Sequence, residues 1–119
     1  MVRYVFDCET NGLLHELDTV HSLVLRDIDD GDVISCSDHD GYESIASGLC
    51  MLSKADVLVG HNVINFDCRA LKKVYKSFKL KKNCKIYDTL IVSRVLWPEL
   101  EPVDHQKFSH IPRKYIGKH

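Results

Sequence analysis

The sequence of 119 residues lacks the features that mark several specialised classes of protein. It has no run of about eighteen apolar residues, so it contains no predicted transmembrane helix. Its five cysteines form an odd set without a C-x-x-C spacing. This pattern argues against a disulfide scaffold or a zinc ribbon and favours reduced thiols in a cytosolic compartment. The N-terminus enters a strand-like segment at once, so we expect no signal peptide.

Proline is scarce as well, and its positions divide the chain. All three prolines lie beyond residue 97, at positions 98, 102 and 112. Proline interrupts helices and central strands because its ring fixes φ and removes the N–H donor. We therefore predict one partial domain over residues 1–97, followed by a proline-containing loop or extended arm over residues 98–119.

The overall composition is that of an ordinary globular protein, but its charge is unevenly distributed. The chain has 16 Lys and Arg against 17 Asp and Glu, for a net charge of −1. Residues 1–68 hold 13 acidic and 3 basic residues, whereas residues 69–119 hold 4 and 13. This asymmetry suits a site that binds metal cations and a polyanion together. The alternative is a local fluctuation that averages out on the folded surface.

Hydrophobic patterns predict the element order β-β-β-α-β-α-β-α. The first three strands are joined by hairpins and should pair antiparallel. The later strands alternate with helices, which favours parallel crossovers. Together they predict an α/β fold with a mixed five-stranded sheet and helices on its faces. The predicted strands are residues 2–6, 20–25, 33–36, 56–60 and 84–87, and the predicted helices are about residues 45–52, 66–78 and 89–96.

The most informative local feature is the pair Asp7 and Glu9 at the end of the first predicted strand. Residues i and i+2 of a strand point to the same face, with Cβ atoms roughly 6.5–7 Å apart. Two carboxylates this close repel each other, and a divalent cation removes that cost. Carboxylate oxygens favour Mg²⁺ or Mn²⁺. The alternative is a pair of solvated acids at a strand end.

A second group of polar residues, His-Asn-Val-Ile-Asn-Phe-Asp, occupies residues 61–67 after the fourth predicted strand. A structural interpretation is that Asp67 complements the dipole of the following helix and that Asn62 caps a turn. However, the fourth strand of such a sheet usually pairs beside the central first strand. Asp67 should then approach Asp7 and Glu9. Three converging carboxylates are costly to bury unpaired, so their convergence would indicate a functional site.

These segments resemble the motifs of the DnaQ-like 3′–5′ exonucleases. Phe-Asp-Cys-Glu-Thr-Asn-Gly-Leu at residues 6–13 resembles the first motif, D-x-E-T-x-x-L. Residues 61–67 resemble the second motif, H-N-x-x-x-[FY]-D, and residues 88–94 resemble the following D-T-L-x-L-S-R segment. The closest likeness is to the N-terminal proofreading domain of bacteriophage family-A DNA polymerases. The resemblance implies an RNase H-like α/β fold and a location in the cytoplasm of an infected bacterial host.

The resemblance also implies a catalytic centre with two divalent metal ions, Mg²⁺ or Mn²⁺. Asp7, Glu9 and Asp67 would be the catalytic metal ligands. One metal would activate a water molecule and the other would stabilise the leaving 3′ oxygen. Such a site suits phosphodiester hydrolysis, because charge develops on both oxygens in line.

Further residues would bind the 3′ end of single-stranded DNA if the resemblance holds. Thr10 would meet the terminal 3′-hydroxyl, and Leu13 would wedge against the last base. Asn62 would help orient the substrate strand. His61 and Phe66, in the second motif, complete the substrate-binding set that the resemblance implies.

One part of the family pattern is missing from this sequence. A full site has a fourth carboxylate in a Tyr-x-x-x-Asp or His-x-x-x-Asp motif on a later helix. Nothing after Asp88 fits, and Asp88 itself is predicted to cap the last helix. We therefore expect the N-terminal part of an exonuclease domain, without the C-terminal helices and with weak or no nuclease activity alone.

The missing motif leaves the partners and the function open between several alternatives. The fourth ligand would come from a second polypeptide that carries the rest of the polymerase, or from a second copy in a homodimer. The alternative function is a non-catalytic relic of the exonuclease fold that binds a protein, such as a host protein. Binding of Mn²⁺ at two sites would favour the nuclease interpretations, whereas no binding would favour the non-catalytic relic.

A basic stretch from Arg69 to Lys85 contains seven lysines, one arginine and no acidic residue. It predicts a track for a nucleic-acid backbone, with contacts from Lys72, Lys73 and Lys76. The alternative is a solvated helix face.

Overall fold

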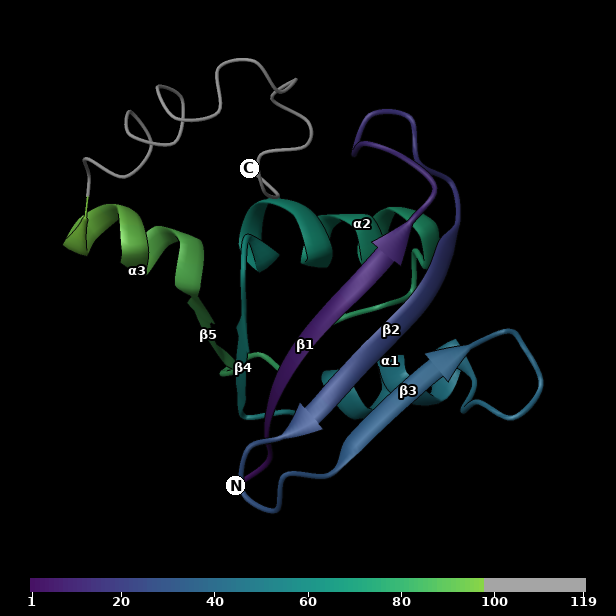
Figure 1. The fold of residues 1–119 in the computed structure, drawn as a ribbon, viewed down its shortest axis with the longest axis horizontal. Helices are drawn as coiled ribbons and strands as arrows, with labels where there is room; N and C mark the ends of the chain where they lie inside the picture. Colours follow the sequence, from purple (N-terminus) through teal and green to yellow (C-terminus); the bar gives the residue numbers. More distant parts are fainter. Residues whose placement is uncertain (98–119) are drawn as a thin grey trace.

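The computed structural model describes residues 1–97, and the predicted arm over residues 98–119 lies outside the described part. The predicted order of strands and α-helices is confirmed (Figure 1). A short π-helical segment, η1, is added before the second α-helix. The strands are β1 (Arg3–Thr10), β2 (Val20–Asp27), β3 (Val33–Ser37), β4 (Val57–Gly60) and β5 (Lys85–Asp88). The helices are α1 (Ile45–Ser53), η1 (Val63–Asp67), α2 (Cys68–Val74) and α3 (Thr89–Leu96).

The five strands form one mixed sheet in the order β3-β2-β1-β4-β5. The hairpin strands β1, β2 and β3 pair antiparallel, whereas β4 is parallel to both β1 and β5. The β2–β3 turn closes with Gly31 at a φ of 80°, a left-handed conformation that glycine adopts without strain. This α/β arrangement confirms the predicted RNase H-like mixed sheet, with β1 at its centre.

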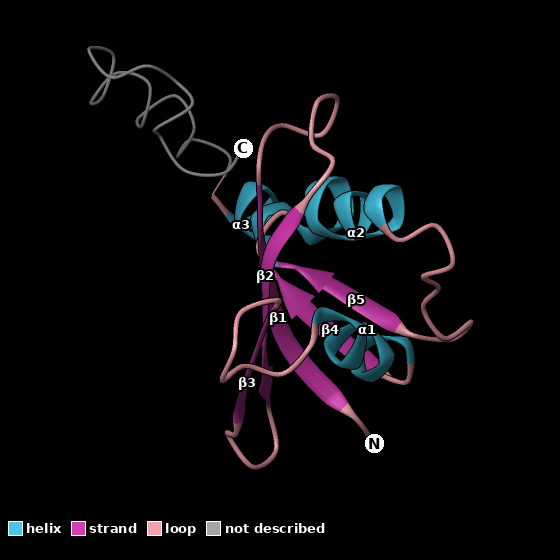
Figure 2. Ribbon diagram, turned by 90° about the vertical axis from the view of Figure 1, so that its right-hand side faces the viewer, coloured by secondary structure: helices cyan, strands magenta, loops and turns pink. Residues whose placement is uncertain are grey.

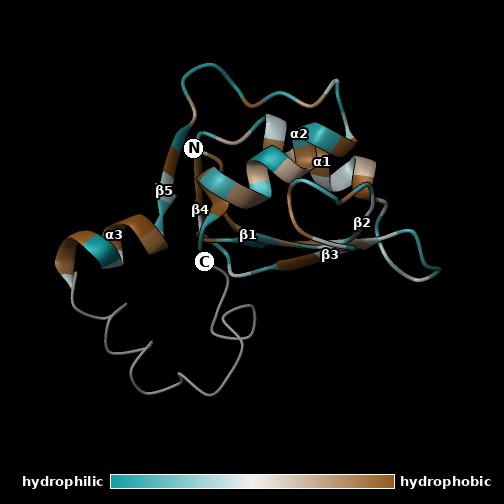
Figure 3. Cartoon of the chain, turned by 90° about the horizontal axis from the view of Figure 1, so that it is seen from above, coloured by the Kyte–Doolittle hydropathy of each residue, from teal (hydrophilic) through white to brown (hydrophobic). Residues whose placement is uncertain are grey.

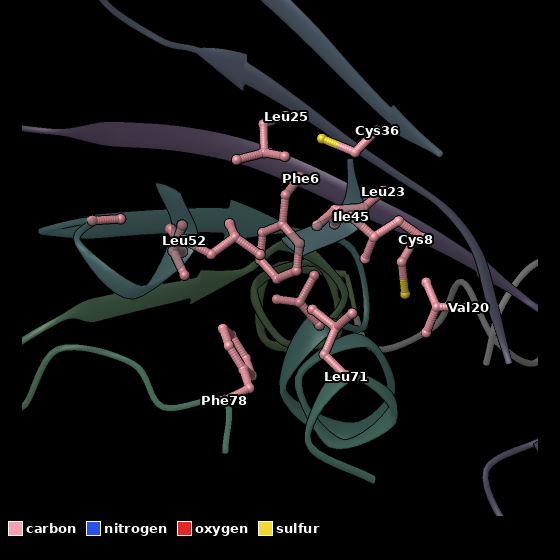
Figure 4. Close-up of a cluster of buried hydrophobic side chains, with 13 residues drawn as sticks. Phe6, Cys8, Val20, Leu23, Leu25, Cys36, Ile45, Leu52, Leu71 and Phe78 are labelled. Carbon is pink, nitrogen blue, oxygen red and sulfur yellow. The ribbon is translucent and has the colours of Figure 1, made fainter. Parts of the chain in front are cut away.

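Helices α1 and α2 cover the same face of the sheet (Figure 2). The reason is the alternation of side chains in the middle of the strands, because buried residues such as Phe6, Cys8 and Leu25 turn toward these helices. The resulting core joins the sheet, α1, α2 and the segment after α2, as Figure 4 shows. Its members include Phe6, Leu23, Leu25, Ile45, Leu52, Leu58, Leu71 and Phe78.

The close approach of β4 to β1 depends on Gly60. A Cβ atom at this position would lie 2.1 Å from Cγ1 of Val63 and 2.9 Å from the carbonyl oxygen of Phe6. Both distances are far inside van der Waals contact, so a side chain here would force the backbone apart. Gly60 thus allows the chain to turn directly from β4 into η1.

The opposite face of the sheet is more exposed in the part of the chain that the structure describes. Val5 and Val24 on the central strands are 41% and 38% exposed. Helix α3 contacts β5 and carries apolar residues (Figure 3). Of these, Val95 is 75% exposed. No helix within residues 1–97 is long and apolar enough to cross a lipid bilayer.

The helix predicted over residues 66–78 is shorter than expected. Its first residues belong to η1, and α2 ends at Val74 because Tyr75 leaves the helical region with φ −114° and ψ 85°. Phe78 is still buried, but it reaches the core from a turn in which its N–H donates to the carbonyl of Tyr75. The chain must return to the start of β5 to complete the parallel crossover, so the helix cannot continue along the lysine-rich segment.

Candidate metal centre

The two acidic residues of β1 lie on the more exposed face of the sheet. Phe6 and Cys8 are buried, whereas Asp7 and Glu9 between and after them are exposed. The same-face geometry expected for residues i and i+2 is therefore present. The pairing of β1 with β4 extends only from Arg3 to Val5, so the following residues of β1 have an edge that β4 does not cover.

Asp67 occupies that uncovered edge. It is the last residue of η1 and is only 1% exposed. Its Oδ2 atom accepts a hydrogen bond of 3.0 Å from the backbone N–H of Cys8. The structure thus seats the Asp67 carboxylate against the backbone of β1, at the residue that separates Asp7 from Glu9. The π-helical form of the segment that carries it is a rare conformation that occurs often at functional sites.

The electrostatics of Asp67 are those of a buried acid that needs a partner. Burial raises the pKa of its carboxyl group from 3.8 to about 6, and the charge of Asp7 contributes to the rise. Among the described residues, its Oδ1 atom is buried and accepts no hydrogen bond. A divalent cation would satisfy this oxygen and neutralise both carboxylates. The available oxygen donors fit Mg²⁺ or Mn²⁺.

The structure brings Asp67 close to Asp7, but it does not assemble the full predicted ligand set. Within residues 1–97, no three side chains of His, Cys, Asp or Glu are grouped closely enough to hold a metal ion. Glu9 lies two residues along the same strand face as Asp7. The site of three carboxylates therefore stays a prediction.

Cys68, which follows Asp67, is not activated for nucleophilic attack. Burial, with a contribution from the charge of Asp67, raises the pKa of its thiol to about 12. The thiol therefore stays protonated at neutral pH. None of the five cysteines, all of which lie in residues 1–97, forms a disulfide bond.

Of the residues predicted to meet the 3′ end, Thr10 is the last residue of β1 and Leu13 lies in the loop after it. The hydroxyl of Thr10 donates a hydrogen bond of 2.9 Å to the carbonyl of Gly12. Leu13 is 58% exposed, and its N–H donates to Oε1 of Glu16 at 3.1 Å. This loop leaves an exposed apolar side chain beyond the end of the strand that carries the acidic pair.

The residues of the second motif have different surroundings. His61 is exposed, and its Nδ1 lies 3.0 Å from Oγ1 of Thr89. Asn62 is only 8% exposed and has a φ of 60°, which is a left-handed conformation that asparagine tolerates. Phe66 is half-buried. The backbone of the motif is thus used to make the turn from β4 into η1.

Of the predicted backbone contacts, Lys72, Lys73 and Lys76 are all exposed. Lys73 donates a hydrogen bond of 2.8 Å from Nζ to the carbonyl of Leu14. Together with Leu14, His15 and Arg69 it lines an open pocket of about 520 Å³. His15 and Arg69 were not among the predicted site residues. For Arg69 the available signal was its spacing from Lys73, because residues i and i+4 share one helix face.

Asp88 caps α3 as predicted, since Oδ1 accepts the N–H of Leu90 at 3.0 Å. The sequence analysis missed its second role. Oδ1 also accepts the N–H of Asn62 at 2.9 Å, and Oδ2 accepts the N–H of Ile64 at 3.0 Å. Burial favours the protonated form, but these N–H donors outweigh it and hold the pKa of the Asp88 carboxyl below its usual value.

Comparison with known proteins supports the fold. A family B DNA polymerase from the hyperthermophilic archaeon Pyrobaculum calidifontis has a similar structure, with a TM-score of 0.52 and 18% sequence identity. The similarity covers 72% of this chain and 13% of the polymerase chain. No family model matches the sequence. No curated protein matches it either.

This similarity shows that the chain has a fold found in part of a DNA polymerase. This agrees with the general expectation from the motifs, which is a fold that occurs in DNA polymerases. The similar polymerase belongs to family B and comes from an archaeon, so the comparison does not extend to the bacteriophage family-A enzymes that the motifs resemble.

Proposed function

We propose that residues 1–97 are part of a metal-dependent 3′–5′ exonuclease domain of a DNA polymerase. The observation that carries this proposal is the carboxylate of Asp67, whose buried Oδ1 atom accepts no hydrogen bond from the described residues and whose pKa is raised by burial and by the charge of Asp7. An unpaired buried carboxylate is costly, and divalent-cation binding offsets that cost. The motif resemblance of residues 6–13, 61–67 and 88–94 supports the same proposal, including its bacteriophage family-A origin.

The proposed substrate is the 3′-terminal phosphodiester of single-stranded DNA. Bound divalent ions would activate a water molecule and stabilise the leaving 3′ oxygen. The chain's own residues would hold those ions through Asp7, Glu9 and Asp67. The exposed side chain of Leu13 would contact the terminal base, and the pocket of His15, Arg69 and Lys73 would receive a backbone phosphate.

A fourth carboxylate would be needed to complete this site. We propose that it comes from a second polypeptide or from a second copy of the chain. On this proposal the chain by itself binds metal but degrades DNA weakly or not at all. Robust Mg²⁺-dependent degradation of single-stranded DNA by the pure chain, lost in Asp7→Ala, would contradict the requirement for a completing partner.

The proposal is tested by calorimetric titration of the chain with Mn²⁺. We expect binding that is lost in Asp67→Asn, because the amide cannot replace an anionic ligand. A matched control is Asp40→Asn, which removes an exposed acid in the loop after β3 and should leave the titration unchanged. An absence of Mn²⁺ binding by the wild-type chain would reject the exonuclease proposal.

One observation favours a second candidate function. Because residues 1–97 contain no group of three metal-binding side chains in ligating positions, the chain could serve as a non-catalytic binding module that keeps the fold. Its partner would be a protein, for example a host protein. The Mn²⁺ titration separates the two candidates, since the binding module requires no metal.

A further inference from the structure

The carboxylate of Asp88 joins two segments that lie far apart in the sequence. Asp88 ends β5, and its register partner in the sheet is Gly60, the last residue of β4. The side chain is 3% exposed and accepts three N–H groups, from Asn62, Ile64 and Leu90. Asn62 belongs to the turn that leads into η1, Ile64 lies in η1 itself, and Leu90 belongs to α3.

Thr89 reinforces the same junction. Its hydroxyl lies 3.3 Å from the carbonyl oxygen of Gly60 and 3.0 Å from Nδ1 of His61. The turn from Gly60 to Ile64 is therefore attached to the Asp88–Thr89 pair by its backbone and by one side chain. This attachment offsets the cost of the left-handed conformation of Asn62, a conformation that is rare outside glycine.

The segment η1 is thus held at both ends by carboxylates. At its start, Asp88 accepts the N–H groups of Asn62 and Ile64. At its end, Asp67 accepts the N–H of Cys8 on β1. Because η1 is only five residues long, a change in its starting turn must change where Asp67 lies relative to β1.

We propose that Asp88 is a positioning residue that fixes the Asp67 carboxylate beside Asp7 by anchoring the turn before η1. Asp88 is not itself a metal ligand, since both of its oxygens already accept backbone N–H groups. The importance of this anchor for catalysis rests on the proposed exonuclease function. Its effect on the position of Asp67 can be tested without any metal.

The test uses Asp88→Ser, because serine caps a helix about as well as aspartate. Its shorter side chain can keep the bond to Leu90 but cannot reach the N–H groups of Asn62 and Ile64. We expect the variant to fold with a circular dichroism spectrum like that of the wild type. The metal-free readout is hydrogen exchange of the Cys8 amide, whose protection depends on its bond to Asp67. We expect that protection to fall by at least about tenfold.

A second readout is the affinity for Mn²⁺, which should fall by roughly 10- to 100-fold, as for other residues that orient metal ligands. The matched control is Ser44→Ala, which removes the cap of α1, a bond of 3.1 Å to the N–H of Ser47. This control should lower stability but leave Cys8 exchange and Mn²⁺ affinity within about twofold of wild type. Asp67→Ala removes the acceptor of the Cys8 amide, so its exchange rate gives the reference value for complete loss of protection.

The two readouts keep this inference separate from the proposed function. If the wild type binds no Mn²⁺ but Asp88→Ser exposes the Cys8 amide, the exonuclease proposal fails and the positioning role stands. If Asp88→Ser folds and Cys8 exchange is unchanged, the positioning role is wrong. Should Asp88→Ser fail to fold, Asp88→Asn replaces it, because an amide keeps the shape but puts an N–H₂ group opposite one backbone N–H. Unchanged Cys8 exchange in that variant would equally overturn the inference.

Discussion

At the scale of single residues, the position of Asp67 decides the chemistry that the chain can support. Its carboxylate combines 1% exposure, one backbone hydrogen bond and a pKa raised to about 6. A group with these properties destabilises the fold when it is charged. Such a cost is reasonable for a ligand that gains its counter-charge from a metal ion.

The raised pKa of Asp67 predicts a pH dependence of stability. Between about pH 4 and pH 6 the folded chain holds a proton at Asp67 more firmly than the unfolded chain does. The free energy of unfolding should therefore fall as the pH rises through this window, by on the order of 3 kcal/mol. Asp67→Asn lacks the titrating group and should not show this fall.

The measurement is urea unfolding of both proteins at several pH values from 4 to 7. The difference between the two free energies reports on Asp67 together with its coupling to Asp7, because the more distant titrating groups contribute equally to both proteins. If the free energies of unfolding of wild type and Asp67→Asn changed in parallel with pH across this window, Asp67 would titrate at its ordinary pKa. Addition of Mn²⁺ at pH 7 should restore stability to the wild type and leave Asp67→Asn unchanged.

At the scale of elements, helix α1 packs so closely on the sheet that it requires a glycine. A Cβ atom at Gly48 would lie 2.7 Å from Sγ of Cys36 and 2.9 Å from Cδ2 of Leu23. Gly48→Ala should therefore destabilise the fold by about 1–3 kcal/mol through overpacking, although alanine is the better helix former.

Thermal unfolding of Gly48→Ala checks this packing, with Cys50→Ala as the matched control. Cys50 is exposed on the same helix, so its replacement should change stability by no more than about 0.5 kcal/mol. A melting temperature for Gly48→Ala at or above that of wild type would mean that α1 can move away from the sheet at little cost.

The elements also show what sequence patterns can and cannot predict. The strands, the hairpins and the cap at Asp88 follow from local residue chemistry, and all were predicted. The early end of α2 at Val74 was not, because the return to β5 is a constraint of the sheet and not of the local sequence. The same holds for the bonds from Asp88 to Asn62 and Ile64. They arise only once β4 and β5 lie side by side.

The candidate site, like the elements, could be predicted only in part from the sequence. The spacing of Asp7 and Glu9 determines a common strand face, and the pairing of β4 with β1 brings Asp67 to that strand. The burial of Asp67 and its bond to Cys8 depend on the π-helical turn, for which the sequence gives no periodic signal. Ligation of a metal by all three acids is still a prediction.

At the scale of the whole molecule, basic side chains of α2 lie beside the loop that follows the acidic strand β1. The acidic pair lies on β1, and the pocket of His15, Arg69 and Lys73 lies where α2 meets the loop after β1. This arrangement predicts a salt-dependent interaction with single-stranded DNA.

Binding of a labelled oligothymidylate, measured by fluorescence anisotropy in EDTA at increasing salt, tests this arrangement. Each phosphate contact to a single strand contributes about 0.7 to the salt slope. The double variant Arg69→Ala/Lys73→Ala should therefore reduce the slope by about 1.4. The matched variant Lys79→Ala/Lys82→Ala, in the exposed segment after α2, should leave the slope unchanged. A weak slope for wild type, or equal losses in both variants, would contradict the predicted contacts.

The close packing of Gly60 against Phe6 and Val63 limits which residues can replace it during evolution. Most surface positions of the chain can accept new residues over evolutionary time without altering the backbone. Position 60 cannot, because every other amino acid would separate the two central parallel strands and displace the turn that leads to Asp67. Divergent descendants of this protein should therefore keep a glycine here even after the rest of their sequence has become unrecognisable.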